Sequence, residues 1–160
     1  MRGVSTDHHE HVAKRSFELS TTVPGAPSAV IDFLMDLDKH LGLHPYLVSA
    51  RVEASGVSHK GPWWDWRVVE EPRIGPIRYR IRFRARLVRT SPTSLESRAR
   101  ALAGCRLRAI TRGVATEDGG TVLTENVVAI APLPLVGYLA RQARTAHAST
   151  YKQLPLVLTR

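Results

Sequence analysis

The sequence contains one cysteine, Cys105, and therefore cannot close an internal disulfide. It contains no run of 18 apolar residues, which is about the shortest stretch that spans a bilayer as a helix. Its first 15 residues lack the apolar core of a secretory signal peptide. Together these absences predict a cytoplasmic protein that folds in a reducing compartment.

Recognisable motifs for metal, nucleotide and covalent chemistry are absent as well. The sequence has no HExxH, CxxC or GxSxG pattern, no P-loop and no dinucleotide fingerprint. We therefore predict neither a cofactor nor a metal site, and we interpret Cys105 as a small buried residue. Three histidines near the start lie in a polar arm that offers nothing to orient them around a metal ion: His8, His9 and His11.

Negative charge is scarce where positive charge is dense. The chain of 160 residues has a formal net charge of +9. Residues 67–112 contain 13 Arg, no Lys, 3 Glu and no Asp, a surplus that exceeds the net charge of the whole chain. In this segment arginines alternate with apolar residues, and a period of two predicts a strand with one apolar and one wet face. The alternating arginines are Arg78, Arg80, Arg82, Arg84 and Arg86.

The wet face of this strand has two interpretations. It could bind an anionic partner, either an acidic carrier protein or an anionic lipid surface. Alternatively, it is a solvated face on which the long arginine stems cover the sheet. Nucleic acid is not expected, because no exposed aromatic residues are interleaved with the arginines to stack on bases.

The chain is interpreted as a flexible arm, residues 1–13, followed by one domain, residues 14–160. Alternating apolar residues predict a strand over Lys14–Val23. Pro27 suits the first turn of a short helix, and Asp36–Leu43 is predicted to form a second one.

From Trp63 to Ala131 the pattern changes to alternation broken by turn residues. Together with the preceding extended run Tyr46–Ala54, it predicts about six antiparallel strands, one of which runs unbroken over Ile74–Arg89. Pro132 then opens a long amphipathic helix, which Pro155 should end or kink. This helix is the only large element that can cover the apolar face of the sheet. The predicted fold is α+β, with space left between the helix and the bent sheet.

This order of elements resembles the START-like helix-grip (SRPBCC) superfamily, and within it the bacterial polyketide cyclase/dehydrase group. Besides the arginine-alternating strand, the resemblance is carried by VPGAPSAV at Val23–Val30, LHP at Leu43–Pro45 and APLPLVGYLARQ at Ala131–Gln142. It covers nearly the whole chain, although the motifs themselves are loose.

The resemblance implies a curved antiparallel sheet of about seven strands wrapped around the C-terminal helix. Members of the superfamily include lipid carriers, binders of hydrophobic ligands, and aromatase/cyclases that act on carrier-protein-bound chains. The superfamily has no universal catalytic signature, so the resemblance transfers no catalytic residue to this chain. Function must therefore be argued from the site itself.

Side chains on the predicted inward faces are the candidate ligand contacts. Trp64 and Trp66 share one face of their strand and would either form an aromatic wall of the cavity or pack in the core. Further candidates lie on the arginine-rich strand and on the apolar stripe of the closing helix: Tyr79, Phe83, Leu139, Ala143 and His147.

Polar residues near these faces are further candidates. Glu125 and Asn126 are adjacent in the last strand, so one of them points inward, and alternation alone does not say which. Asp65 and Arg67 share a face and could form an ion pair. His44 and Tyr138 lie near helix ends, where a cavity could open.

The leading hypothesis is a binder or carrier of a hydrophobic small molecule, such as a lipid, a polyketide or an isoprenoid-like compound. The alternative is a polyketide aromatase/cyclase or dehydratase acting on a carrier-protein-bound chain by general acid–base chemistry. In that enzyme His147, or an inward-facing Asp65 or Glu125, would move protons. A third hypothesis is a surface adaptor whose arginine face binds an acidic partner and releases it as salt rises.

Overall fold

The computed structural model of the chain describes residues 11–159. Strand β1 (Val12–Val23) leads into helix α1 (Pro27–Met35) and the 3₁₀ helix η1 (Leu37–His40). The remaining elements are β2 (Leu47–Ser58), β3 (Gly61–Glu70), β4 (Arg73–Ile74), β5 (Ile77–Arg78), β6 (Ile81–Ser91), β7 (Ser94–Arg100), β8 (Arg106–Ala115), β9 (Thr121–Pro132) and α2 (Leu133–Val157).

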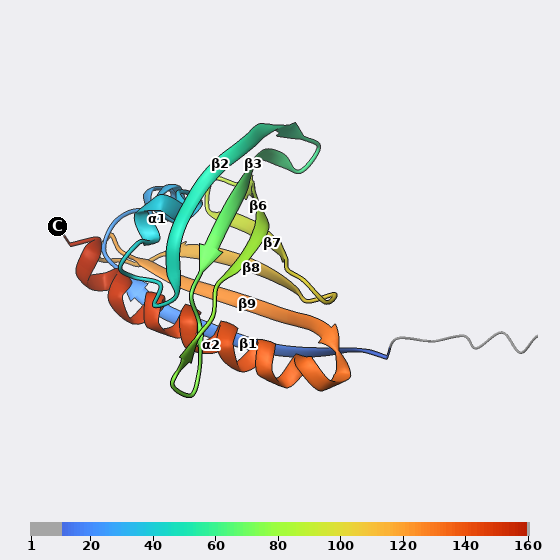
Figure 1. Cartoon of the computed structure of the whole chain (residues 1–160). Helices are drawn as coiled ribbons and strands as arrows, with labels where there is room; N and C mark the ends of the chain where they lie inside the picture. The colour runs from blue at the N-terminus through green and yellow to red at the C-terminus, as the bar shows by residue number, and fades with distance from the viewer. Residues whose placement is uncertain (1–10, 160) are drawn as a thin grey trace, which may run out of the picture.

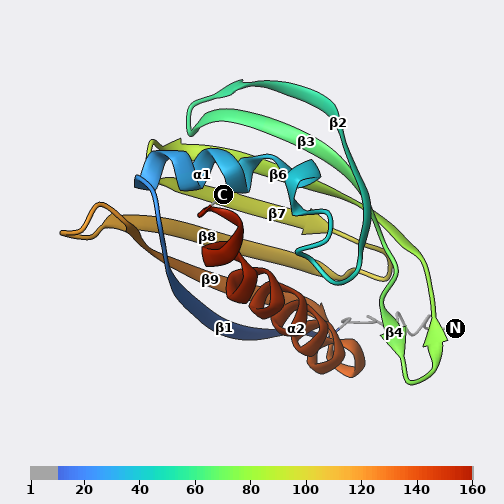
Figure 2. The same ribbon diagram turned by 90° about the vertical axis from the view of Figure 1, so that its left-hand side faces the viewer.

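Seven of these strands form one antiparallel sheet in the order β1-β9-β8-β7-β6-β3-β2. Short turns make β6, β7, β8 and β9 consecutive neighbours, and β1 returns to pair with β9 along its whole length. The sheet curves around α2, and α1 lies over the same face (Figure 1; Figure 2). The predicted curved antiparallel sheet with a long closing helix and two short helices is confirmed.

Side-chain alternation decides which residues face α2. In β9, Leu123 and Val127 are almost completely buried, whereas Asn126 is exposed. The buried residues of α2 recur at helical spacing from Val136 to Leu154, so one stripe of the helix faces the sheet. The far end of α2 joins residues of α1, β3 and β6 in a single core cluster.

Two predicted boundaries in the strand region were wrong. The strand over Ile74–Arg89 is interrupted by a two-stranded hairpin, β4–β5, and the long strand β6 starts only at Ile81. The turn falls at Gly75, whose φ of 56° favours glycine, and at Pro76, which has no backbone N–H for a ladder. β1 begins at Val12, inside the predicted arm, and residues 1–10 of that arm lie outside the described residues.

The predicted bounds of the second short helix and of the long closing helix differ in detail from those in the structure. The second short helix is only the four-residue turn η1, because Gly42 adopts a φ of 83° and Pro45 follows closely. Pro155 lies inside α2, which ends two residues later at Val157. The proline is tolerated because it sits in the last turn, where few further backbone hydrogen bonds remain to be lost.

Candidate functional site

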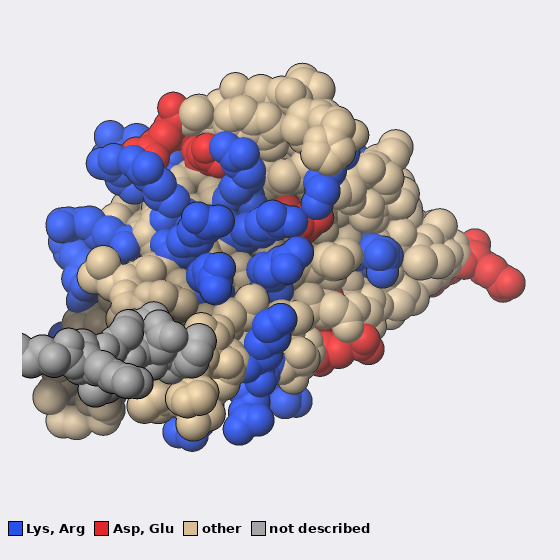
Figure 3. Space-filling view, turned by 90° about the vertical axis from the view of Figure 1, so that its right-hand side faces the viewer, with Lys and Arg blue, Asp and Glu red and all other residues tan. Residues whose placement is uncertain are grey.

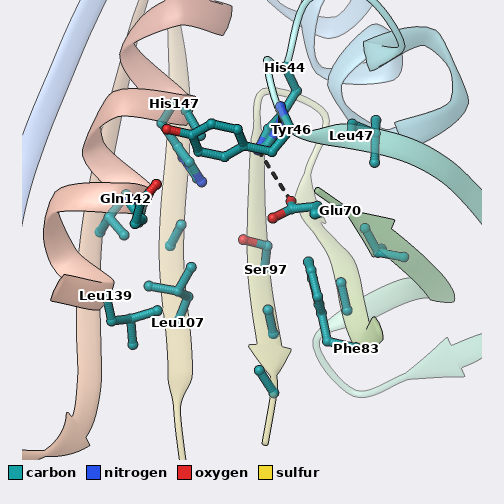
Figure 4. Close-up of a pocket in the computed structure, with 18 of the residues that line it drawn as sticks. His44, Tyr46, Leu47, Glu70, Phe83, Ser97, Leu107, Leu139, Gln142 and His147 are labelled. Carbon is teal, nitrogen blue, oxygen red and sulfur yellow. Dashed lines mark hydrogen bonds and ion pairs between the residues drawn. The ribbon is translucent and has the colours of Figure 1, made fainter. Parts of the chain in front are cut away.

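A cavity of about 390 Å³ lies between α2 and the inner face of the sheet. Its wall is mostly apolar, and Phe83 and Leu107 of the sheet face Leu139 of α2 across it (Figure 4). The closing helix therefore crosses the sheet without filling the space beneath it. Pockets that bind small molecules have volumes of roughly 300–1,000 Å³, and this cavity falls within that range.

Five of the predicted ligand contacts line this cavity: Tyr79, Phe83, Leu139, Ala143 and His147. Strand alternation and helical spacing place four of them, because both periodicities fix the direction of a side chain relative to its neighbours. The exception is Tyr79, which lies between β5 and β6, outside any strand. Their contact with a ligand stays a prediction.

The two residues of the predicted aromatic wall do not line the cavity, which corrects that interpretation. Trp66 is 6% exposed and belongs to the core cluster that contains Ile31 and Leu34 of α1, and Trp64 packs against the same cluster. The two tryptophans share one face of β3, as alternation predicts, and both pack into this core cluster. They stabilise the core instead of facing the cavity.

Asp65 and Asn126 also lie away from the cavity. The carboxylate of Asp65 accepts two hydrogen bonds from Arg86, at 2.6 and 2.8 Å, and does not pair with Arg67. These hydrogen bonds hold the pKa of Asp65 below its ordinary value. In β9 the inward residue is Glu125, which lines the cavity, while Asn126 points to solvent. The structure thus decides the choice that alternation left open.

The predicted arginine face is divided by the β4–β5 hairpin. Arg82, Arg84 and Arg86 lie on the outer face of β6, whereas Arg78 and Arg80 belong to the hairpin and the segment after it. Figure 3 shows lysine and arginine side chains gathered on one side of the molecule. Ion pairs offset part of this charge, and they join Arg80 to Glu71, Arg84 to Glu53, Arg86 to Asp65 and Arg98 to Glu96.

His147 of α2 pairs with the buried Glu125 of β9. The Nδ1 atom of His147 lies 2.9 Å from Oε2 of Glu125. Burial opposes a positive charge on His147, but the carboxylate of Glu125 outweighs it, so the pKa of His147 lies above its ordinary value. Within residues 11–159, the other ring nitrogen, Nε2, has no hydrogen-bond partner. This leaves one nitrogen oriented by a carboxylate and the other free for a ligand.

A second pair, His44 and Glu70, lies across from His147 (Figure 4). The backbone N–H of Tyr46 donates to Nδ1 of His44 at 3.3 Å, so a neutral ring carries its proton on Nε2. That Nε2 atom lies 3.4 Å from Oε1 of Glu70. The rings of His44 and His147 meet edge to face with centroids 6.4 Å apart. The cavity therefore holds two histidine–glutamate pairs close together.

Burial shifts the protonation of these groups. It raises the pKa of Glu70 to about 7, although the nearby His147 counteracts part of the shift. It lowers the pKa of His44 to about 3, with His147 and His40 adding to the effect. It also lowers the pKa of His40 to about 4. Near neutral pH both His40 and His44 are uncharged, and Glu70 is partly protonated.

Glu70 was missed by the sequence analysis, although a signal for it existed. It follows Trp66 and Val68 at a period of two, so it shares their inner face. Its position at the end of a strand, beside Glu71 and Pro72, is also typical of an exposed turn, so alternation alone does not show that it is enclosed. Only the folding of β2 and η1 over this end encloses its side chain.

Contacts between α2 and the β4–β5 region close one side of the cavity. The hydroxyls of Tyr79 and Tyr138 are hydrogen bonded to each other. The side-chain amide of Gln142 donates to the backbone carbonyl of Arg73 at 3.4 Å. Three buried polar atoms in the cavity wall lack a hydrogen-bond partner within the described part of the chain, namely His40 Nε2, Gln142 Oε1 and the Tyr151 hydroxyl. Such unpaired groups are costly, and a ligand or water that pairs with them is favoured.

Among residues 11–159, no three His, Cys, Asp or Glu side chains converge as a metal ion requires. No described helix combines the length and the hydrophobicity needed to cross a bilayer.

Comparison by sequence gives no match, either to a family model or to a curated protein. Comparison by structure gives many matches. The Zhui aromatase/cyclase from Streptomyces sp. R1128 superposes with a TM-score of 0.74 at 12% identity, covering 92% of this chain and 95% of that one. This chain has the START-like helix-grip fold.

Two further helix-grip structures extend the comparison. A protein from Thermus thermophilus matches with a TM-score of 0.70 and 14% identity, over 91% of this chain and 97% of that one. A START superfamily protein from Mycobacterium smegmatis matches with a TM-score of 0.65 and 13% identity, over 89% and 98% of the two chains. The TM-scores establish the helix-grip fold, and identities this low leave function to the residues of the cavity.

Proposed function

We propose that this chain binds a hydrophobic small molecule in the cavity between α2 and the sheet. The observation that carries the proposal is the apolar, preformed space of about 390 Å³ with its polar groups concentrated around His44 and His147. Removal of apolar ligand surface from water stabilises such a complex by roughly 25 cal/mol per Å². A lipid, a polyketide or an isoprenoid-like compound has the required surface.

The polar groups favour a ligand whose hydrogen-bonding end is uncharged. Glu70 has no lysine or arginine within ion-pair distance in the described structure, and its partner His44 is neutral near pH 7. An ionised carboxyl group beside Glu70 would meet a like charge in a poorly solvated site. A hydroxyl or carbonyl group can hydrogen-bond there without that cost.

Binding can be measured by native mass spectrometry of the purified chain, followed by titration with a matched pair of ligands, 1-tetradecanol and tetradecanoic acid. We expect the purified chain either to retain a lipophilic compound or to bind the alcohol directly. At pH 8 the alcohol should bind at least about tenfold more tightly than the acid, because ionised Glu70 repels the carboxylate of the acid. The variant Ala99→Phe places a ring in the cavity and should weaken binding about tenfold or more.

The matched control is Ala115→Phe, which adds the same ring at an exposed position of β8 outside the cavity. It should bind the alcohol as the unchanged protein does. Equal affinity of Ala99→Phe and the unchanged protein would contradict binding in this cavity. Tighter binding of the acid would contradict the uncharged ligand class.

A second candidate function is favoured by the His147–Glu125 pair. An aromatase/cyclase or dehydratase needs a base beside the carbonyl groups of a bound chain. Neutral His147 would take a proton at Nε2 from the carbon next to a carbonyl, and the electron pair would pass to the carbonyl oxygen to form an enolate. Glu125 would stabilise the imidazolium that results. This candidate rests on the pair, since the similarity to the Streptomyces enzyme extends only to the fold.

Turnover of a β-ketone thioester can test this candidate by product analysis. Because only neutral His147 acts as the base, the rate should rise as the pH passes upward through its pKa. His147→Gln, which can still donate a hydrogen bond to Glu125, should lower the rate by about 100-fold or more. Product formation at the full rate by His147→Gln would exclude His147 as the base.

A further inference from the structure

Exposed leucine and isoleucine side chains gather on three neighbouring segments at the mouth of the cavity. These mouth segments are the β4–β5 hairpin, the turn between β7 and β8, and the first turn of α2. Fourteen large hydrophobic side chains of the described chain are exposed, and nine of them, six valines with Leu41, Ile110 and Leu156, lie outside these segments. The five on the mouth segments, with their exposed fractions, are Ile74 (55%), Ile77 (65%), Leu102 (84%), Leu133 (62%) and Leu135 (37%).

Several contacts place these segments around the same opening. Leu102 and Leu135 are both exposed and both line the cavity, so they mark its edge. A side chain at Gly104, in the β7–β8 turn, would lie 3.8 Å from Pro132 at the start of α2. The hairpin is held to α2 by the hydrogen bond from Gln142 to the carbonyl of Arg73. In Figure 2 the hairpin projects at the lower right, on the same side as the start of α2.

The β7–β8 turn presents Leu102 in a defined backbone conformation. The N–H of Cys105 donates to the carbonyl of Leu102 at 3.2 Å, and the two residues between them both have positive φ, 57° at Ala103 and 70° at Gly104. These values correspond to a type I′ turn. Ala103 is the only non-glycine residue of the described chain with a positive φ. An alanine in this conformation is strained, and such strain tends to occur at functional positions.

The mouth segments and the residues beside them carry basic side chains and no acidic ones. Residues 72–82, 100–106 and 131–142 contain no Asp or Glu. In the described structure, most of their arginines form no ion pair; the exception is Arg80, which pairs with Glu71. The arginines of these stretches are Arg73, Arg78, Arg80, Arg82, Arg100, Arg106 and Arg141. Their positive charge surrounds apolar tips, the combination that attaches proteins to the surface of an anionic bilayer.

We infer that the mouth segments dock on an anionic membrane surface, with Ile77 and Leu102 entering the interfacial layer. A fluid bilayer accepts separate apolar tips on three turns, whereas a folded protein partner would need a matching pocket for each of them. Docking in this orientation turns the mouth of the cavity toward the lipid, so an apolar ligand passes between bilayer and cavity without crossing water. Membrane docking goes beyond the binding of a ligand in the cavity, and separate experiments measure docking and ligand binding.

Co-sedimentation of the full chain with lipid vesicles tests the inference. We expect binding to vesicles of phosphatidylcholine containing phosphatidylglycerol, little binding to pure phosphatidylcholine, and weaker binding as salt rises. The double variant Ile77→Ser/Leu102→Ser should bind at least about tenfold more weakly, since it removes two apolar tips. Arg106→Ala should bind about fivefold more weakly. These side chains are exposed, so the variants should keep the circular dichroism spectrum of the unchanged protein.

The controls remove similar side chains from the opposite end of the sheet. Val57→Ser/Val114→Ser changes two exposed residues beside the β2–β3 and β8–β9 turns, and Arg112→Ala lies on the same strand as Arg106. Both should bind vesicles as the unchanged protein does. Equal losses in control and mouth variants, or no binding to any vesicle, would overturn the inference. Binding to an acidic protein but to no vesicle would also overturn it and assign the surface to a protein partner.

Discussion

Replacement of His147 by alanine is expected to lower the free energy of unfolding by roughly 3 kcal/mol. The reason is that Glu125, which is 7% exposed, loses the only side chain that hydrogen-bonds to it in the described structure. A buried carboxylate without a partner carries the full cost of its lost hydration. Urea denaturation followed by circular dichroism at pH 7 measures the loss.

A second substitution distinguishes this cause from simple loss of packing. In the His147→Ala background, Glu125→Gln removes the buried charge and should restore more than half of the lost stability. His59→Ala is the control, since this exposed histidine lies in the β2–β3 turn and should change the free energy by less than about 0.5 kcal/mol. If the double variant were less stable than His147→Ala, the unpaired charge would not be the cause.

Glu70→Gln is expected to stabilise the protein at pH 8 by about 3 kcal/mol. Burial raises the pKa of Glu70 from 4.5 to about 7, and each pKa unit corresponds to about 1.4 kcal/mol. A carboxyl group whose pKa is raised on folding binds more protons in the folded state, so its contribution becomes less favourable as the pH rises between these two values. Glutamine has the same shape, carries no charge, and can still lie beside Nε2 of His44.

The gain should shrink to below about 1 kcal/mol at pH 5, where Glu70 is protonated in the folded state. His40 and His44 act in the opposite direction, because their lowered pKa values remove stability as the pH falls below 6.5. Both the unchanged protein and Glu70→Gln lose this stability, so the loss cancels when their free energies of unfolding are compared. Glu71→Gln, at the neighbouring partner of Arg80, serves as the control and should show a small change. A Glu70→Gln variant no more stable than the unchanged protein at pH 8 would show that ionised Glu70 is not destabilising.

Both expected results concern the stability cost of the polar side chains that line the cavity. The His147–Glu125 pair is stabilising only while both partners remain, and ionised Glu70 is destabilising near neutral pH. A cavity that served only the stability of the fold would favour apolar residues at these positions. The cost of keeping polar groups there is consistent with their use in ligand binding, since proteins retain unfavourable groups at functional sites.

Much of the candidate site follows from periodicity in the sequence. Phe83 faces the cavity because it alternates with arginines along β6, and Ala143 and His147 face it because they are four residues apart on α2. Alternation also placed Trp64 and Trp66 on one face of their strand. It could not show that Trp66 belongs to the core and not to the cavity wall, because that depends on how segments distant in the sequence pack around it.

The sequence by itself determined the α+β fold, the order of its elements and the face on which most side chains lie, since these depend on local spacing. The tertiary structure alone decided which inward residues border the empty volume, which carboxylates meet histidines, and where Gly75 and Pro76 divert the arginine-rich strand into a hairpin. Pairs such as Glu125 with His147 join segments 22 residues apart on different elements. Their meeting depends on the angle at which helix and sheet pack, and residue spacing along one element carries no information about that angle.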